Sequence, residues 1–211
     1  MASKKINILK SLSIERLNAF SDGVFAIAIT LLVLGIAVPE VMPGPHLNEE
    51  LTNRLIALFP KVLSFGISFT IIGIFWFGHH LLFQYIKKID RNLIWLNIFL
   101  LMVISFIPFP AALLGEYGYA QPAILIYGLT LLIVGILFAT IWWYAARKRN
   151  FIDDSLDDHM IKKALNIILL ASMSYFIAIV VSFFNPFISL LIYVLIPILY
   201  IIPSPIDEFI K

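Results

Sequence analysis

The sequence predicts an all-α integral membrane protein with six transmembrane helices. Of its 211 residues, 61% are hydrophobic and only 13% are charged, and the mean hydropathy is +0.98, which excludes an ordinary soluble domain. Apolar segments close to the length of about 20 residues that a spanning helix needs recur along the whole chain. We therefore treat residues 1–211 as one transmembrane domain. The predicted spans are 17–38, 60–86, 92–115, 122–146, 162–184 and 186–203.

The first span carries polar residues near its start. Residues 24–38 alone would make about 22 Å of helix, which is too short for a hydrocarbon core of about 30 Å. We therefore expect the helix to begin after Ser13, a suitable N-cap, so that Asp22 lies within the helix. Because a carboxylate in a membrane helix is costly, Asp22 is a candidate functional residue.

The remaining spans show local signals for helix starts and breaks. Residues 46–60 repeat leucine at helical spacing and place Glu50 four residues before Arg54, which indicates a short interfacial helix. Proline is expected to kink or end the third helix at Pro108 and to separate the last two helices at Pro186.

The distribution of basic residues predicts the orientation. Thirteen of the 15 Lys and Arg residues lie before the first span, between spans two and three, between spans four and five, or at the C-terminus. Only Arg54 and Lys61 lie on the other side, so both termini should be cytoplasmic in a multi-pass protein of the cell membrane. The formal net charge of +2 argues against a nucleic-acid partner, and the absence of cysteine excludes thiolate metal sites.

Polar side chains of the first three spans are predicted to lie at one depth. Asp22, His80 and Asn97 each lie six or seven residues from a basic residue at the predicted cytoplasmic end of their helix, which corresponds to about 9–10 Å. Buried polar groups in lipid need hydrogen-bond partners, and Asp22 can find them at this depth. The candidate partners are His79, His80, Trp76 and Asn97. The simplest interpretation is a layer that holds the helices together.

Other chemistries fit these residues less well. Adjacent His79 and His80 point about 100° apart on a helix, whereas a chelating pair is usually three or four residues apart, so we expect no metal site. The spans contain neither a nucleophile elbow nor an HExxH motif, so we expect no enzyme. A proton-coupled secondary transporter that uses Asp22 and His80 stays open as an alternative. Four acidic residues lie between the fourth and fifth spans, and we interpret them as a solvated loop and helix start rather than a cation site: Asp153, Asp154, Asp157 and Asp158.

An apolar stripe follows the first helix. Ile27, Leu31 and Leu34 obey the i, i+4, i+7 rule, with Thr30 on the adjoining flank. Such a stripe arises readily by chance and then means packing or lipid contact, and the Thr30 hydroxyl would bond back to the carbonyl of Ala26. A ring of branched aliphatic residues can, however, close a channel by dewetting, and a threonine ring can replace part of an ion's hydration shell. The TVGYG filter is absent, which excludes the usual class of potassium channel.

Several motifs resemble one known family. Arg16 followed by Phe20-Ser21-Asp22 and GVFAIAITLLVL is similar to the signature of the transmembrane protein 175 family, the endosomal and lysosomal potassium channels and their prokaryotic relatives. The resemblance continues in IGIFWFGHHLLF (72–83) and in residues 92–117. Prokaryotic members have one six-helix repeat and assemble as tetramers, and this chain, with one FSD motif, resembles them.

The resemblance implies a passive, potassium-selective cation channel whose homotetramer surrounds a pore lined by the first helix of each subunit. Ile27 matches the narrowest hydrophobic constriction of the family, Leu31 and Leu34 its further apolar rings, and Thr30 its selectivity-linked threonine. Gly35 stands where members often have an acidic residue, so the sequence does not decide whether the outer mouth attracts cations. The implied partners are a lipid bilayer, potassium ions and further copies of the chain, with no cofactor.

In the same resemblance, the conserved motif of the family organises the pore helix near its cytoplasmic end without touching the ion. Arg16 and Asp22 differ by six positions and so face different ways on one helix, which leaves Arg16 to pair with a neighbouring helix or subunit. The residues implied in this structural network are Arg16, Phe20, Ser21, Asp22, Trp76, His79, His80 and Asn97.

Overall fold

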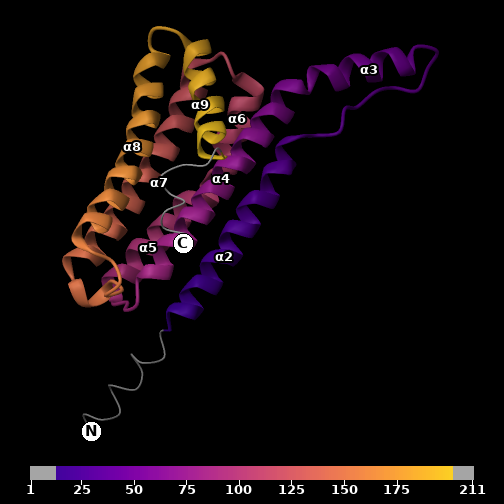
Figure 1. Ribbon diagram of the computed structural model, residues 1–211. Helices are drawn as coiled ribbons and strands as arrows, with labels where there is room; N and C mark the ends of the chain where they lie inside the picture. Colours follow the sequence, from indigo (N-terminus) through magenta and orange to yellow (C-terminus); the bar gives the residue numbers. More distant parts are fainter. Residues whose placement is uncertain (1–12, 202–211) are drawn as a thin grey trace.

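The computed structural model describes residues 13–201, and the side chains of residues 13–198 (Figure 1). Its regular secondary structure, within the described residues, is helical apart from one isolated bridge between Ile86 and Ile152, and loops join the helices. The helices are α2 (Ile14–Leu31), α3 (Leu47–Ala57), α4 (Phe59–Tyr85), α5 (Arg91–Phe106), α6 (Pro108–Tyr117), α7 (Gln121–Arg147), α8 (Asp158–Ser182) and α9 (Pro186–Ile201), with 3₁₀ turns η1 (Leu32–Gly35) and η2 (Arg149–Phe151). Outside the described residues lie Lys4, Lys5, Lys10 and Lys211, which contributed to the orientation prediction, and the last two residues of the predicted sixth span, 202 and 203.

The all-helical membrane architecture is confirmed. Five helical segments of the described chain are long and apolar enough to cross a membrane. The predicted sixth span contains α9, which the structure describes over 16 residues up to Ile201, the last described residue. The predicted third span consists of α5 and α6, which follow one another with a break at Ile107.

The first helix begins where the sequence predicts and ends earlier. Ser13 caps α2 by accepting a hydrogen bond from the backbone N–H of Arg16 at 3.3 Å, and Asp22 lies inside the helix as expected. The predicted end at residue 38 is wrong, because the chain tightens into η1 and becomes extended at Ile36. At this end a Cβ added to Gly35 would lie 3.2 Å from the Cβ of Ala112, so α6 passes close to the end of the first helix.

Caps and prolines set the other helix ends. The break before Pro108 is confirmed, since α5 ends at Phe106 and α6 begins at the proline. The break at Pro186 is also confirmed, because the Asn185 side chain accepts hydrogen bonds from the backbone N–H groups of the next helix. Helix α8 begins four residues before the predicted span because Asp157 caps it, accepting from the N–H of Met160 at 2.7 Å.

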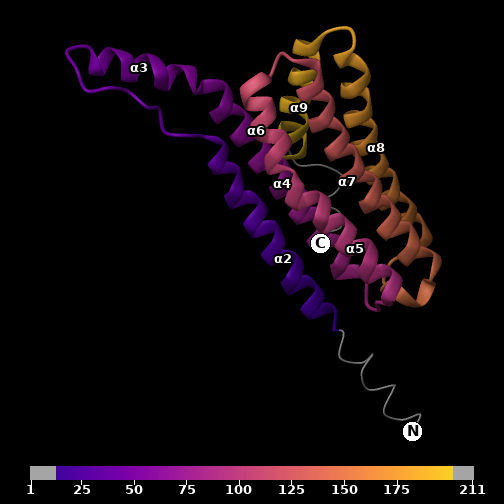
Figure 2. The same ribbon diagram turned by 180° about the vertical axis from the view of Figure 1, so that it is seen from behind.

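The arrangement leaves the first helix on one flank of the bundle. α7 is central and packs against α5, α6, α8 and α9, and its Tyr127 and Trp142 are almost completely buried. α2 packs against α4 and α5 on one flank, and α8 forms the opposite flank (Figures 1 and 2). α3 projects away from the bundle and buries no residue, and its Glu50–Arg54 pair forms at 3.4 Å as expected. One whole face of α2 is therefore free of contacts with the described chain.

Candidate pore helix and its polar support

The predicted apolar stripe lies on the outward face of α2. The opposite face, which includes Phe25 and Ala28, is buried against α4 and α5. The exposed fractions of the stripe residues are 60% for Ile27, 41% for Leu31 and 74% for Leu34. The stripe therefore contributes little to the core of its own chain and is available to a pore, to lipid or to another subunit.

Thr30 lies exposed on the flank of the stripe. Its hydroxyl donates to the carbonyl of Ile27 at 2.8 Å. The carbonyl of Ala26, expected from the usual i−4 bond of threonine, is not the acceptor in this structure. The shorter i−3 bond suits the last turn of α2, which tightens into η1 two residues later. Because the hydroxyl proton points at the backbone, the oxygen lone pairs are left to face outward, where they can accept from water or contact a cation.

A buried hydrogen-bond network holds the inner face of α2. Ser21, His79 and Asn97, from α2, α4 and α5, are all buried. His79 Nε2 lies 2.9 Å from Asn97 Oδ1, and Asn97 Nδ2 donates to Ser21 Oγ at 3.0 Å. The Ser21 hydroxyl in turn donates to the carbonyl of Leu17 at 2.8 Å. Since the Asn97 oxygen can only accept, His79 carries its proton on Nε2, and the three helices are joined by one directed chain of hydrogen bonds.

Asp22 lies outside this buried network. Of its four expected partners, the structure shows a hydrogen bond with Trp76, whose Nε1 donates to Asp22 Oδ1 at 2.8 Å. His79 bonds Asn97 instead, and Asn97 in turn donates to Ser21. The exposed His80 lies beside Trp76, with 6.1 Å between their ring centroids. The prediction that Asp22 itself meets His79 and Asn97 is therefore wrong, because on this helix it is the neighbouring serine that faces α5.

Aromatic rings enclose the buried histidine. His79 stacks on Phe83 with a centroid distance of 4.4 Å, and Phe25 of α2 lies 5.6 Å away. Phe138 of α7 closes a further side at 6.5 Å. The sequence analysis missed these contacts, although the spacing of four residues between His79 and Phe83 is a helical signal for one of them. Together the rings restrict the imidazole to the orientation that bonds Asn97.

The FSD motif is thus divided between two faces. Ser21 points into the bundle, whereas Phe20 and Asp22 are exposed. The Arg16 side chain is also exposed, and its pairing with a neighbouring helix or subunit stays a prediction. The inward residue anchors the helix to its own chain, and the outward residues lie where a second chain or lipid would contact them.

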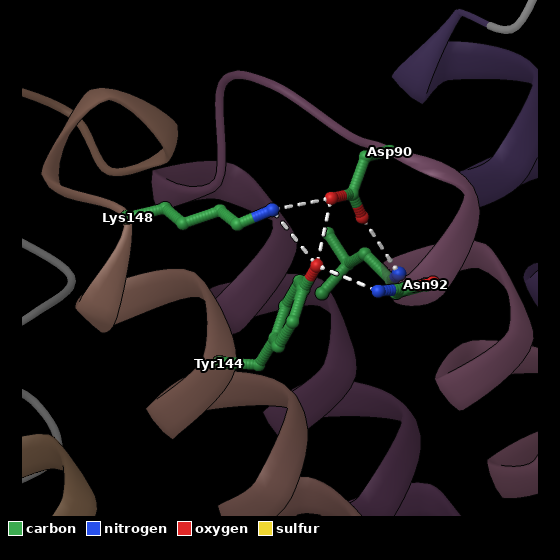
Figure 3. A network of polar contacts seen from close by, with 5 residues as sticks. Asp90, Asn92, Tyr144 and Lys148 are labelled. Carbon is green, nitrogen blue, oxygen red and sulfur yellow. Dashed lines mark hydrogen bonds and ion pairs between the residues drawn. The ribbon is translucent and has the colours of Figure 1, made fainter.

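A second polar network joins the start of α5 to the end of α7 (Figure 3). Asp90 caps α5 by accepting from the N–H of Leu93 at 2.9 Å, and its other oxygen accepts from Tyr144 and Lys148, each at 2.7 Å. Partial burial opposes ionisation, yet the hydrogen bonds from Lys148, Leu93 and Tyr144 outweigh it and hold the pKa of Asp90 below its usual value. The sequence analysis missed this cap, although an aspartate directly before an apolar helical run is a recognisable signal.

The segment with the four aspartates, residues 153–158, contacts the loop between α4 and α5, close to this network in the chain. Asp153 pairs with Lys87 at 3.2 Å, and the backbone of Lys87 donates to the carbonyl of Phe151 at 2.7 Å. Hydrogen bonds from the backbone and side chain of Ser155, and then from Lys87, lower the pKa of Asp153 to about 2. These contacts, with Asp157 as a helix cap, support the interpretation of the segment as a loop and helix start. Among the described residues, no group of three or more His, Cys, Asp or Glu side chains is placed to hold a metal ion.

Comparisons with known proteins agree on one family. The family model described as "Endosomal/lysosomal potassium channel TMEM175" matches residues 16–108, which run from the start of α2 to the start of α6. A potassium channel of Streptomyces collinus is 40% identical over 67% of this chain and 69% of its own length. A potassium channel of Chamaesiphon minutus is 36% identical over 82% of this chain and 86% of its own length.

A solved structure extends the match to three dimensions. The crystal structure of a lysosomal potassium-selective channel TMEM175 homolog from Chamaesiphon minutus superposes with a TM-score of 0.78 at 34% identity, covering 89% of this chain and 95% of that one. This coverage includes far more than the segment matched by the family model. The chain therefore belongs to the TMEM175 family and aligns with prokaryotic members of that family over most of their length.

Proposed function

We propose that this chain forms a potassium-selective cation channel in which α2 of each subunit of a homotetramer lines a central pore. Conduction is passive, so the protein needs neither catalytic chemistry nor a cofactor, and potassium is the permeant ion. The named potassium channels among its relatives support this choice of ion. The location that we propose is the cell membrane, with both termini in the cytoplasm.

One observation carries the proposal. α2 is a membrane-length helix that is anchored on its inner face by a buried polar network and leaves an apolar stripe exposed on its outer face. A helix that only filled the bundle would bury its branched aliphatic side chains, and a helix that only met lipid would need no directed hydrogen bonds to fix its rotation. Fixed rotation is what a pore helix requires, because each pore-facing side chain has to reach the axis in all four subunits.

The stripe and its flank supply the two elements that selective conduction needs. Four copies of Ile27 form the narrowest apolar ring, with further rings at Leu31 and Leu34, and such rings oppose the passage of hydrated ions by dewetting. The Thr30 oxygens, whose protons are engaged with the backbone, replace part of the hydration shell of potassium. Residue 35 is a glycine, and a Cβ added there would lie 3.2 Å from the Cβ of Ala112, so in this proposal attraction of cations at the outer mouth does not depend on a carboxylate at residue 35.

The charge distribution supports the proposed orientation. The start of α2, the loop between α4 and α5 and the loop between α7 and α8 lie at the same end of the bundle (Figure 1). These segments carry Arg16, Lys87, Lys88 and Arg91, together with the basic residues around the start of α8. By the positive-inside rule this end faces the cytoplasm.

Flux measurements in liposomes test the proposal. With purified protein and an outward potassium gradient, we expect a passive current that reverses at the potassium equilibrium potential and does not change when the proton gradient is collapsed. The transporter alternative keeps one geometric argument, since Asp22 and His80 both lie beside Trp76. A saturating flux that requires a proton gradient and is lost in Asp22→Asn and His80→Gln would replace the channel by a carrier. Absence of any potassium flux from a folded, reconstituted protein would refute both.

A further inference from the structure

The structure contains an apolar cavity that the proposed pore does not use. It has a volume of about 120 Å³ and lies between α4, α7 and α8. Along α4 its lining runs from Ile74 to Tyr85, which is about 16 Å of helix, so the cavity is elongated parallel to the helices. Its inner wall is aromatic and includes Phe75, Phe138 and Trp142.

Small residues create this space. Gly78 lies on the α4 wall, and Ala164 and Ala171 lie on the α8 wall. A Cβ added to Gly78 would meet nothing within 4 Å, so the hollow at this position is not needed for backbone packing. α4 packs mainly against α2 and α6, and α8 mainly against α7 and α9, which leaves a cleft between α4 and α8. Lining residues of both helices, among them Gly78 and Ile167, are partly exposed, so the cavity is not fully enclosed.

Water is a poor occupant of this cavity. A buried water needs two to four polar partners, and apolar cavities of this size stay dry and accept apolar guests. The indole N–H of Trp142 already donates to the carbonyl of Ile161 at 3.0 Å. An empty void would forfeit the dispersion contacts of every side chain around it. A hydrocarbon chain can restore those contacts, and its linear shape suits an elongated cavity.

We propose that this cavity binds one acyl chain of a membrane phospholipid. Five of the residues that line the cavity belong to α8, which forms the flank opposite α2 (Figures 1 and 2). If α2 surrounds the pore, the α8 flank faces the surrounding bilayer rather than a second subunit, and this step rests on the proposed function. Lys162 is exposed and lies two residues before the lining residue Ala164, at the end of α8 that the proposed orientation assigns to the cytoplasm, so this end of the helix carries a cation that would favour a phosphate headgroup.

Photolabelling tests the proposal. The full chain is reconstituted in phosphatidylcholine vesicles that contain a phospholipid with a diazirine in the middle of one acyl chain, and labelled residues are located by mass spectrometry. We expect labelling at Gly78 and Ala171, which line the cavity, and labelling at the exposed Met102 of α5, which reports contact with bulk lipid outside the cavity. Gly78→Leu, which fills the cavity, should lower labelling of Ala171 at least fivefold and leave Met102 unchanged.

Gly73→Leu is the matched control variant. Gly73 is also on α4 with no atom within 4 Å of an added Cβ, but it does not line the cavity, so labelling should stay at the wild-type level. If Gly78→Leu does not fold, Ala171→Leu fills the cavity from the other wall, with labelling read at Gly78. Equal labelling of wild type and the filled variant, or labelling by a photoreactive free fatty acid but not by the phospholipid, would overturn the proposal. Labelling does not depend on ion flux, so a failure of the channel function and a failure of lipid binding are separate results.

Discussion

Substitution of Ile27 by asparagine separates a pore-facing stripe from a packed one. Ile27 is 60% exposed in the single chain, whereas Ile29, two residues away, is half-buried and packs against the core. If four copies of Ile27 meet at the axis, the amides of Ile27→Asn are solvated by pore water. One net hydrogen bond between an amide and water is worth about 1 kcal/mol, which would raise the rate of passage about fivefold if it lowers the barrier at the constriction by that amount.

The matched variant Ile29→Asn is expected to behave in the opposite way. It places an amide among apolar side chains at a cost of about 1–3 kcal/mol per subunit, so folding or expression should fall without a gain in current. Leu31→Asn and Leu34→Asn, farther along the stripe, should resemble Ile27→Asn.

Single-channel recording and thermal unfolding of these variants provide the two readouts. We expect higher conductance or open probability with near wild-type stability for the three stripe variants, and lower stability alone for Ile29→Asn. Equal destabilisation at Ile27 and Ile29 with no gain of current at either position would refute the assignment of α2 as the pore helix.

Three further predictions concern the network, the selectivity residue and the loops. Asn97→Leu leaves the buried N–H of His79 without its acceptor and should lower the free energy of unfolding by about 1–3 kcal/mol, whereas unchanged stability would show that the network does not hold α2. Thr30→Ala should lower the potassium-to-sodium permeability ratio, and an unchanged reversal potential under bi-ionic conditions would contradict a selectivity role. Asp90→Asn keeps the helix cap but loses the ion pair with Lys148, worth about 0.5–1 kcal/mol. The pKa of Asp90 is lowered in the folded state, so the wild type should have a higher free energy of unfolding than Asp90→Asn at any pH above about 4. This difference in stability should disappear as pH falls through the lowered pKa. Unfolding measured at pH 7 and pH 3 tests this, and a difference that is unchanged at pH 3 would contradict the assignment.

The sequence by itself determined the class of the protein and most helix positions. Long apolar runs can be accommodated only as helices in a bilayer, because every backbone hydrogen bond has to be satisfied within the segment. Helix ends followed from local chemistry as well: Ser13 caps the first helix, and prolines begin α6 and α9. These signals act within a few residues of one another, so no knowledge of the tertiary contacts was needed to interpret them.

Only the tertiary structure decided which side chains meet. The sequence indicated a polar layer but assigned Asp22 to it, whereas Ser21 makes the contact with Asn97 and Asp22 turns outward to Trp76. Adjacent residues point about 100° apart on a helix, so a modest rotation exchanges one for the other. In a soluble protein the apolar periodicity would fix that rotation, but a membrane helix is apolar on both its lipid-facing and its buried side. The rotation of α2 is therefore set by the partners on α4 and α5, which are distant in the sequence.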